Sequence, residues 1–119
     1  MTAPHFLIVA DGDFAPMTSK TANSVIRYLP DRTVGVLDRQ QAGKTVQDVL
    51  GFGGSIPIVG SMKAGLAHGP TAVLIGIAPQ GGRMPAEWRA WLAEALDHGR
   101  HTGAKAGQVL RGPGASPPR

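Results

Sequence analysis

The sequence predicts an α/β protein with a Rossmann-like, doubly wound parallel sheet of four or five strands in three α/β/α layers. Four short, nearly continuous apolar runs indicate buried strands, because strands covered on both faces lack the alternation of half-exposed ones. Helical patterns alternate with these runs, as the crossover connections between parallel strands require. Right-handed crossovers then place helices on both faces of the sheet.

The elements are expected in regular alternation along the chain. Thr18 or Ser19 can cap the first helix, and Pro57 indicates an edge position for the third strand because proline cannot donate to a neighbouring strand. Trp88 and Trp91 lie on the face of the last helix that is expected to contact the sheet. The strands are expected at residues 6–10, 33–38, 56–60 and 72–77, and the helices at residues 19–28, 44–50, 61–68 and 86–98.

Residues 1–99 are expected to form this one domain, and residues 100–119 a basic, Gly/Pro-rich tail that is disordered. A fifth strand would fall near residues 101–110, where the apolar pattern is weak. The net charge of +4 comes entirely from Arg100, Lys105, Arg111 and Arg119, so residues 1–98 are electrically balanced. Because a nucleic-acid surface needs basic residues clustered on a folded face, no specific nucleic-acid binding is expected.

Composition excludes several classes of function. The 119 residues contain no cysteine, which excludes disulfides, thiolate metal sites and cysteine nucleophiles. The four histidines show no metal-ligand spacing, so no metal is expected. No apolar run approaches the ~18 residues of a membrane span, and residues 1–10 lack the basic start of a signal peptide. A cytoplasmic protein without a membrane partner is therefore expected.

Three loops that follow predicted strands combine small or hydroxyl residues with a cation just before a helix. Ligands of parallel sheets bind beyond the carboxyl ends of the strands, and helix N-termini with a nearby cation favour anions. These loops therefore predict a site for a small anionic ligand. The alternative is that the hydroxyls cap helices and the cations are solvated. The candidate residues are Thr18, Ser19, Lys20 and Thr21, then Gly43, Lys44 and Thr45, and finally Gly81, Gly82 and Arg83.

Two familiar nucleotide-binding motifs are incomplete. A phosphate-binding P-loop needs a glycine five residues before Gly43, where Asp38 stands, and the dinucleotide fingerprint is missing from the loop after the first strand. Asp38 nevertheless ends the second strand, where an acidic residue can bind a ribose. The alternative is an aspartate that begins a turn.

Asp11 and Asp13 stand together at the end of the first strand as possible polar support for a site. Two neighbouring carboxylates can act as general acid and base or bind a metal, and the alternative is an Asx-turn around Gly12. No serine has a visible His–Asp partner, so the sequence shows no catalytic group that would act alone.

The same segments resemble the N-terminal domain of the D-glutamate N-acetyltransferase family, whose members have also been labelled NAD-dependent epimerase/dehydratase. The resemblance covers residues 6 to about 99. It is carried by the sequences DGDFAPMTSKTANSVIRY at 11–28, LD at 37–38, AGKT at 42–45, IPI at 56–58 and IGIAPQGGRMPAEWR at 75–89.

The resemblance implies a Rossmann-like domain followed by a P-loop domain, in an enzyme of D-amino-acid catabolism that uses an acetyl donor. It therefore implies acetyl-CoA or a nucleotide as cofactor, with the three loops as ligand surface. The P-loop domain is absent from this sequence, so the chain is expected to be a stand-alone or truncated N-terminal domain.

The leading hypothesis is thus a domain that binds a nucleotide, an acyl-CoA or an acidic amino acid at the carboxyl edge of the sheet. One alternative is a non-catalytic interaction module that forms a homo-oligomer or docks the missing domain. Another is an NAD(P)-binding, oxidoreductase-like domain.

Overall fold

The computed structural model describes residues 4–76, 85–102 and 108–111, and contains five parallel strands. Their order in the sheet is β3-β2-β1-β4-β5, which is the order of a Rossmann-like fold. The predicted fold class is confirmed. The strands are β1 (Phe6–Val9), β2 (Thr33–Leu37), β3 (Ile58–Val59), β4 (Ala72–Ile75) and β5 (Gln108–Arg111).

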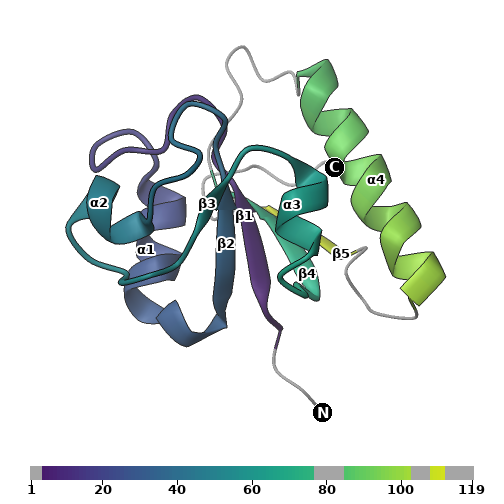
Figure 1. Ribbon diagram of the computed structural model, residues 1–119, viewed down its shortest axis with the longest axis horizontal. Helices are drawn as coiled ribbons and strands as arrows, with labels where there is room; N and C mark the ends of the chain where they lie inside the picture. The colour runs from purple at the N-terminus through teal and green to yellow at the C-terminus, as the bar shows by residue number, and fades with distance from the viewer. Residues whose placement is uncertain (1–3, 77–84, 103–107, 112–119) are drawn as a thin grey trace, which may run out of the picture.

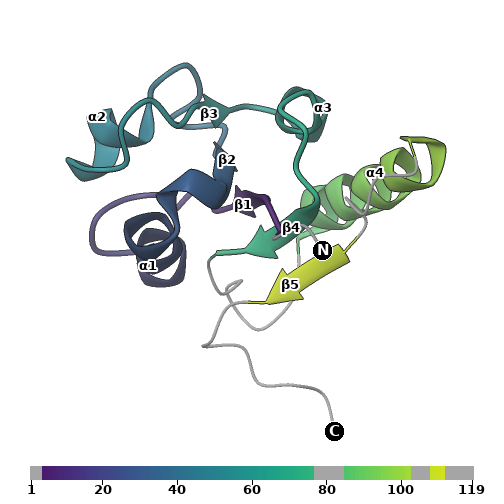
Figure 2. The same ribbon diagram turned by 90° about the horizontal axis from the view of Figure 1, so that it is seen from below.

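Helices cover both faces of the sheet (Figures 1 and 2). The helices α1 (Lys20–Tyr28) and α2 (Val46–Leu50) lie on one side, and α3 (Met62–Leu66) and α4 (Ala86–Thr102) lie on the other. A short 3-10 turn, η1 (Pro30–Arg32), links α1 to β2. None of the helices in the described ranges is long and apolar enough to cross a membrane.

The C-terminal part of the chain corrects the predicted domain boundary. The helix α4 continues to Thr102, and β5 pairs in parallel with β4 from Gln108 to Arg111. Residues 100–102 and 108–111 therefore belong to the fold and not to a disordered tail. The apolar pattern of residues 101–110 is weak, so the sequence did not predict β5. Pairing with β4 stabilises this strand, and such a tertiary contact cannot be inferred from local sequence. Residues 103–107 and 112–119 lie outside the described residues.

β3 occupies the edge of the sheet, as Pro57 predicted. The backbone of residues 43–46 runs along the outer side of this strand. The Gly43 and Val46 amides donate to the carbonyls of Ile58 and Ile56, and the Ile58 amide donates to the Lys44 carbonyl. This pairing covers an edge that would otherwise expose unpaired backbone groups.

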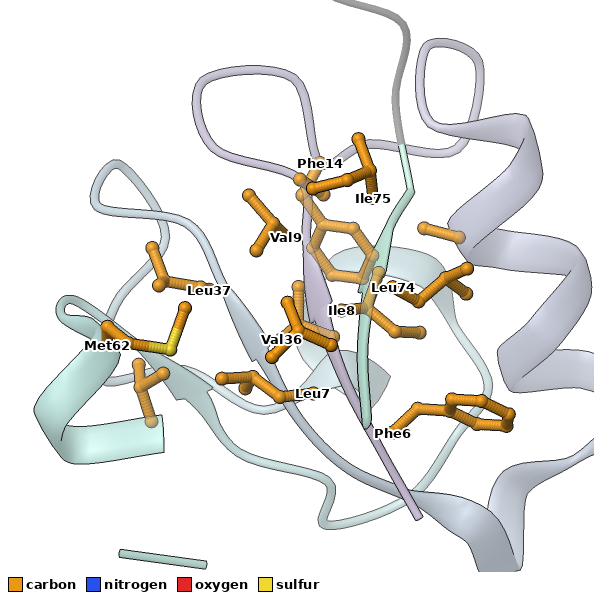
Figure 3. Packing of buried hydrophobic residues seen from close by; sticks show 14 of the residues in the cluster. Phe6, Leu7, Ile8, Val9, Phe14, Val36, Leu37, Met62, Leu74 and Ile75 are labelled. Carbon is orange, nitrogen blue, oxygen red and sulfur yellow. The ribbon is translucent and has the colours of Figure 1, made fainter. Parts of the chain in front are cut away.

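The core is built mainly from aliphatic side chains of the strands, as Figure 3 shows. The central strand β1 contributes Leu7, Ile8 and Val9, all of them buried. Phe14 comes from the loop after β1 and is buried at the same end of the cluster as Val9 and Ile75 (Figure 3). Because Phe14 is held in the core, it anchors this loop to the carboxyl edge of the sheet.

Candidate functional site

The strand order reverses between β1 and β4, and α1 begins at this point. The chain leaves β1 toward β2 on one side, whereas β4 and β5 follow on the other. The first turn of α1 is joined to the end of β4, because the Ala22 amide donates to the Gly76 carbonyl at 3.2 Å. In open parallel sheets this reversal is where ligands bind. The start of α1 is therefore the candidate site.

Gly76 allows this close approach of helix and sheet. A Cβ atom at this position would lie 2.5 Å from Cγ2 of Ile8 and 2.8 Å from Cβ of Ala22. Such distances do not occur between real carbon atoms without a shift of one neighbour. The absence of a side chain at Gly76 thus sets the position of the α1 N-terminus.

The loop between β1 and α1 is braced from within by polar side chains. The Ala15 amide donates to Ser19 Oγ at 3.1 Å, and Asn23 Nδ2 donates to the carbonyls of Ala15 and Pro16 at 3.0 and 3.2 Å. Thr18 Oγ1 donates to the Asp13 carbonyl at 2.6 Å. Each of these polar groups is therefore occupied by a hydrogen bond within the loop or to the first turns of α1.

Two of the four candidates in this loop serve the fold. Ser19 is buried, and its hydroxyl bonds to Ala15 instead of capping the helix or facing a ligand. The Thr18 hydroxyl is exposed but bonded to the backbone. By contrast, Lys20 is exposed, and no described residue accepts a hydrogen bond from the Lys20 or Thr21 amide. Lys20 and Thr21 are thus the candidates that remain open to a ligand.

The second candidate loop lies two strands away, at the β3 edge. The amides of Gly43 and Lys44 donate to Ile58 and Gln41 carbonyls, and Lys44 Nζ donates to Gln41 Oε1 at 2.9 Å. Thr45 and Asp48 cap α2 reciprocally, and these bonds to Thr45 lower the pKa of Asp48. The expectation of free amides here is corrected, because the Gly43 amide donates to β3, the Lys44 amide to the Gln41 carbonyl and the Thr45 amide to Asp48 Oδ2.

The third candidate loop, with Gly81, Gly82 and Arg83, lies outside the described residues.

Asp38 connects two loops through hydrogen bonds to its side chain. The residue is only 1% exposed, and its Oδ1 accepts the amides of Gly12 at 3.1 Å and of Gln40 at 2.9 Å. The Gln40 amide donates to the Asp38 side chain, and the Gln41 amide donates to the Asp38 carbonyl. These two hydrogen bonds confirm the alternative interpretation, in which Asp38 begins a turn. Oδ1 is thus occupied by two backbone amides inside the protein, and the ribose contact stays a prediction.

Asp11 is paired with Arg39, a residue that sequence reasoning missed. Arg39 Nη2 lies 2.8 Å from Asp11 Oδ2, and the Arg39 amide donates to Asp11 Oδ1 at 2.8 Å. The guanidinium Cζ also lies 5.1 Å from the centroid of the Trp91 ring. Arg39 thus links the ends of β1 and β2 to α4. In the sequence, Arg39 is 28 or more positions away from Asp11 and Trp91, so no local motif indicates these contacts.

The two aspartates of the first loop have different surroundings. The Asp11 carboxylate accepts hydrogen bonds from Arg39, and this pairing holds it in place of the Asx-turn that was the alternative. Asp13 is exposed, and its amide donates to the Ala10 carbonyl in the turn at Gly12. Within the described residues, no three His, Cys, Asp or Glu side chains are grouped as a metal would require.

The Asp11–Arg39 pair predicts a small acid sensitivity of stability. Burial alone would raise the pKa of Asp11, but the hydrogen bonds and charge of Arg39 outweigh it and hold the pKa below its usual 3.8. A lowered folded-state pKa stabilises the protein above the unfolded-state value, and this stabilisation is lost as the pH falls through the folded-state pKa. We expect the difference in unfolding free energy between wild type and Asp11→Asn to be about 1 kcal/mol or less at pH 7. It should shrink below pH ~4.

Urea unfolding of both proteins between pH 2.5 and 7 measures this difference. A gap that stays constant down to the lowest pH would show that Asp11 is not ionically held by Arg39. The variant Asp13→Asn is the control, because it removes a carboxylate from the same loop without changing the Asp11–Arg39 pair.

Comparisons with known proteins agree with this fold. The sequence profile of a Rossmann-like domain of unknown function, DUF1611_N, matches residues 39–106, which is more than half of the chain. The crystal structure of a DUF1611 family protein from Anabaena variabilis ATCC 29413 is 32% identical and superposes with a TM-score of 0.72. The match covers 81% of this chain but 28% of that one. No curated protein matches. The chain belongs to the DUF1611_N family of Rossmann-like domains.

Proposed function

We propose that this domain binds an anionic small molecule at the carboxyl edge of the sheet, at the start of α1. The observation that carries the proposal is the location of Lys20 and Thr21. Their amides have no acceptor among the described residues, and they lie where the strand order reverses. Amides at a helix N-terminus carry a partial positive charge, and the exposed Lys20 side chain adds a full one.

The resemblance to D-glutamate N-acetyltransferases supports the ligand class. Acetyl-CoA carries phosphates and D-glutamate carries carboxylates, and either anion suits a helix N-terminus with a lysine. Acetyl transfer to D-glutamate is accordingly proposed for a complete family protein, since this chain spans 28% of its Anabaena relative. Dinucleotide binding through a ribose at Asp38 lacks support, because that carboxylate is buried and accepts two amides.

Isothermal titration calorimetry with acetyl-CoA, ATP, NAD and D-glutamate tests the proposal. We expect at least one of them to bind with a Kd of ~10 μM to 1 mM, as suits a site open on one side. Lys20→Ala should weaken that binding about tenfold, because it removes the cation beside the amides. If none of the four ligands binds at 1 mM or below, the proposal is wrong.

Lys44→Ala is the matched control. Lys44 is also exposed, but it bonds to Gln41 beside the covered β3 edge. Its replacement should leave the Kd within twofold of the wild-type value. Equal weakening by both variants would indicate a general charge effect in place of a site at α1.

A second candidate function, a non-catalytic interaction module, is favoured by the exposed Met17 side chain in the loop after β1.

A further inference from the structure

The end of α1 and the turn η1 form an exposed corner of the molecule, residues 27–32, which we call the α1 corner. All six of these residues are exposed. Tyr28 and Leu29, at 77% and 39%, are two of the four exposed large apolar side chains in the described ranges, and Pro30 follows them directly. The corner thus joins three neighbouring apolar side chains between charged ones. Apolar surface with a polar rim is typical of an interaction site.

The α1 corner is supported from behind by contacts within the chain. The Leu29 carbonyl accepts the Arg32 amide at 3.1 Å and the Thr33 hydroxyl at 3.2 Å. The Arg27 guanidinium lies over the Phe52 ring, 4.3 Å from its centroid. Since these contacts order the corner before any partner arrives, association costs little further conformational entropy there.

The charges of the α1 corner are self-complementary and are not paired within the chain. Asp31 stands between Arg27 and Arg32 in the sequence, and none of the three forms an ion pair with another described residue. In a two-fold contact the same surface of both copies meets, so an acidic and a basic residue in one patch can pair twice. This pattern of charge indicates a second copy of the chain as the partner of the α1 corner.

We propose that the α1 corner is a self-association surface, through which two copies of this chain pair about a two-fold axis. Tyr28 and Leu29 of the two copies form the apolar centre, and Asp31 of each copy pairs with Arg32 of the other. Tyrosine and arginine are enriched among the residues that contribute most to binding at interfaces. The corner lies at the amino edge of the sheet, where α1 ends and β2 begins (Figure 1). Lys20 is at the other end of α1, so the proposal does not depend on anion binding.

Sedimentation equilibrium of the complete chain measures this self-association. We expect the average mass to rise from monomer toward dimer between about 10 μM and 1 mM, with a Kd on the order of 100 μM. The association is weak because six residues are fewer than the ~20–30 per side of a stable interface. A chain that stays monomeric over this whole range of concentration would overturn the proposal.

A pair of variants matched in exposure locates the contact. Tyr28→Asp should weaken the association by about tenfold or more, because it places a charge from each copy in the apolar centre. Met17→Asp changes a side chain that is 76% exposed in the loop after β1, at the other edge of the sheet. It should alter the association less than about twofold. Equal weakening by both variants, or weakening by Met17→Asp alone, would overturn the proposal.

An exchange of charges tests the two-fold pairing itself. Asp31→Arg and Arg32→Asp each bring like charges together, so each variant alone should associate about tenfold more weakly than wild type. An equal mixture of the two variants has opposite charges at both pairs and should associate within about threefold of wild type. Both side chains are exposed, so circular dichroism should show an unchanged fold. A mixture as weak as the separate variants would overturn the proposal. Lys20→Ala should leave the association unchanged, so its failure and the failure of anion binding are distinguishable.

Discussion

Replacement of Asp38 by alanine is expected to lower the free energy of unfolding by about 2–4 kcal/mol. The carboxylate is buried, and its Oδ1 accepts the amides of Gly12 and Gln40 from two different loops. Hydrogen bonds to a charged group contribute about 1.5–3 kcal/mol each, and the partly solvated amides recover some of this through water. Asp38→Asn should lose less, about 1 kcal/mol, because its amide oxygen can still accept.

Urea unfolding at pH 7 measures these values, and Asp13→Ala is the control. Asp13 lies in the same loop with an exposed side chain, so its replacement should change stability by less than about 0.5 kcal/mol. If Asp38→Ala were as mild as Asp13→Ala, the hydrogen bonds from Gly12 and Gln40 to this carboxylate would contribute little to stability.

The second large effect is expected for Gly76→Ala, which should destabilise the protein by about 2–3 kcal/mol. The new methyl group would meet Ile8 Cγ2 at 2.5 Å and Ala22 Cβ at 2.8 Å. Ala22 has no side-chain rotation with which to retreat, so α1 itself must move. That movement would lengthen the 3.2 Å hydrogen bond from the Ala22 amide to Gly76. Because α1 carries Lys20, anion binding should weaken as well.

Gly35→Ala provides the control within the same sheet. Its methyl group would lie 3.4 Å from Leu7 Cδ1 and 3.6 Å from the Pro57 carbonyl oxygen, which are ordinary contacts. We expect a change of less than about 0.5 kcal/mol, since replacing glycine in a strand also reduces the freedom of the unfolded chain. Thermal or urea unfolding compares the two, and equal losses would contradict the tight contact at Gly76.

The layout of the fold was predictable because its signals are local. Continuous apolar runs located four strands within a few residues, and Pro57 indicated that β3 lies at an edge. Helix caps were predictable where the hydroxyl has no competitor. Ser61 Oγ accepts the Ala64 amide at 3.1 Å, and Thr45 takes part in a reciprocal cap. β5 was the exception, because pairing with β4 and not its own pattern defines it.

The candidate site was less predictable because its contacts join distant parts of the sequence. Asp38 meets Gly12 across 26 positions, and Arg39 meets Asp11 across 28. Ser19 stands at the position where a helix cap is expected. In the folded loop, however, its hydroxyl is hydrogen-bonded to the Ala15 backbone and does not cap α1. Residue type and spacing therefore found the segments around the site, while tertiary contacts decided which side chains remain open.

The outer side of β3 is covered, so a further strand cannot pair with the sheet there. Residues 43–46 occupy the hydrogen-bonding groups along that flank, whereas β5, within the described ranges, has a strand neighbour on one side. Among the described strands, β5 is therefore the one from which a homologue would enlarge this sheet, or a misassembled chain would add a strand. Within the described part of the chain, the architecture thus directs both evolutionary extension and strand-mediated aggregation to the same margin.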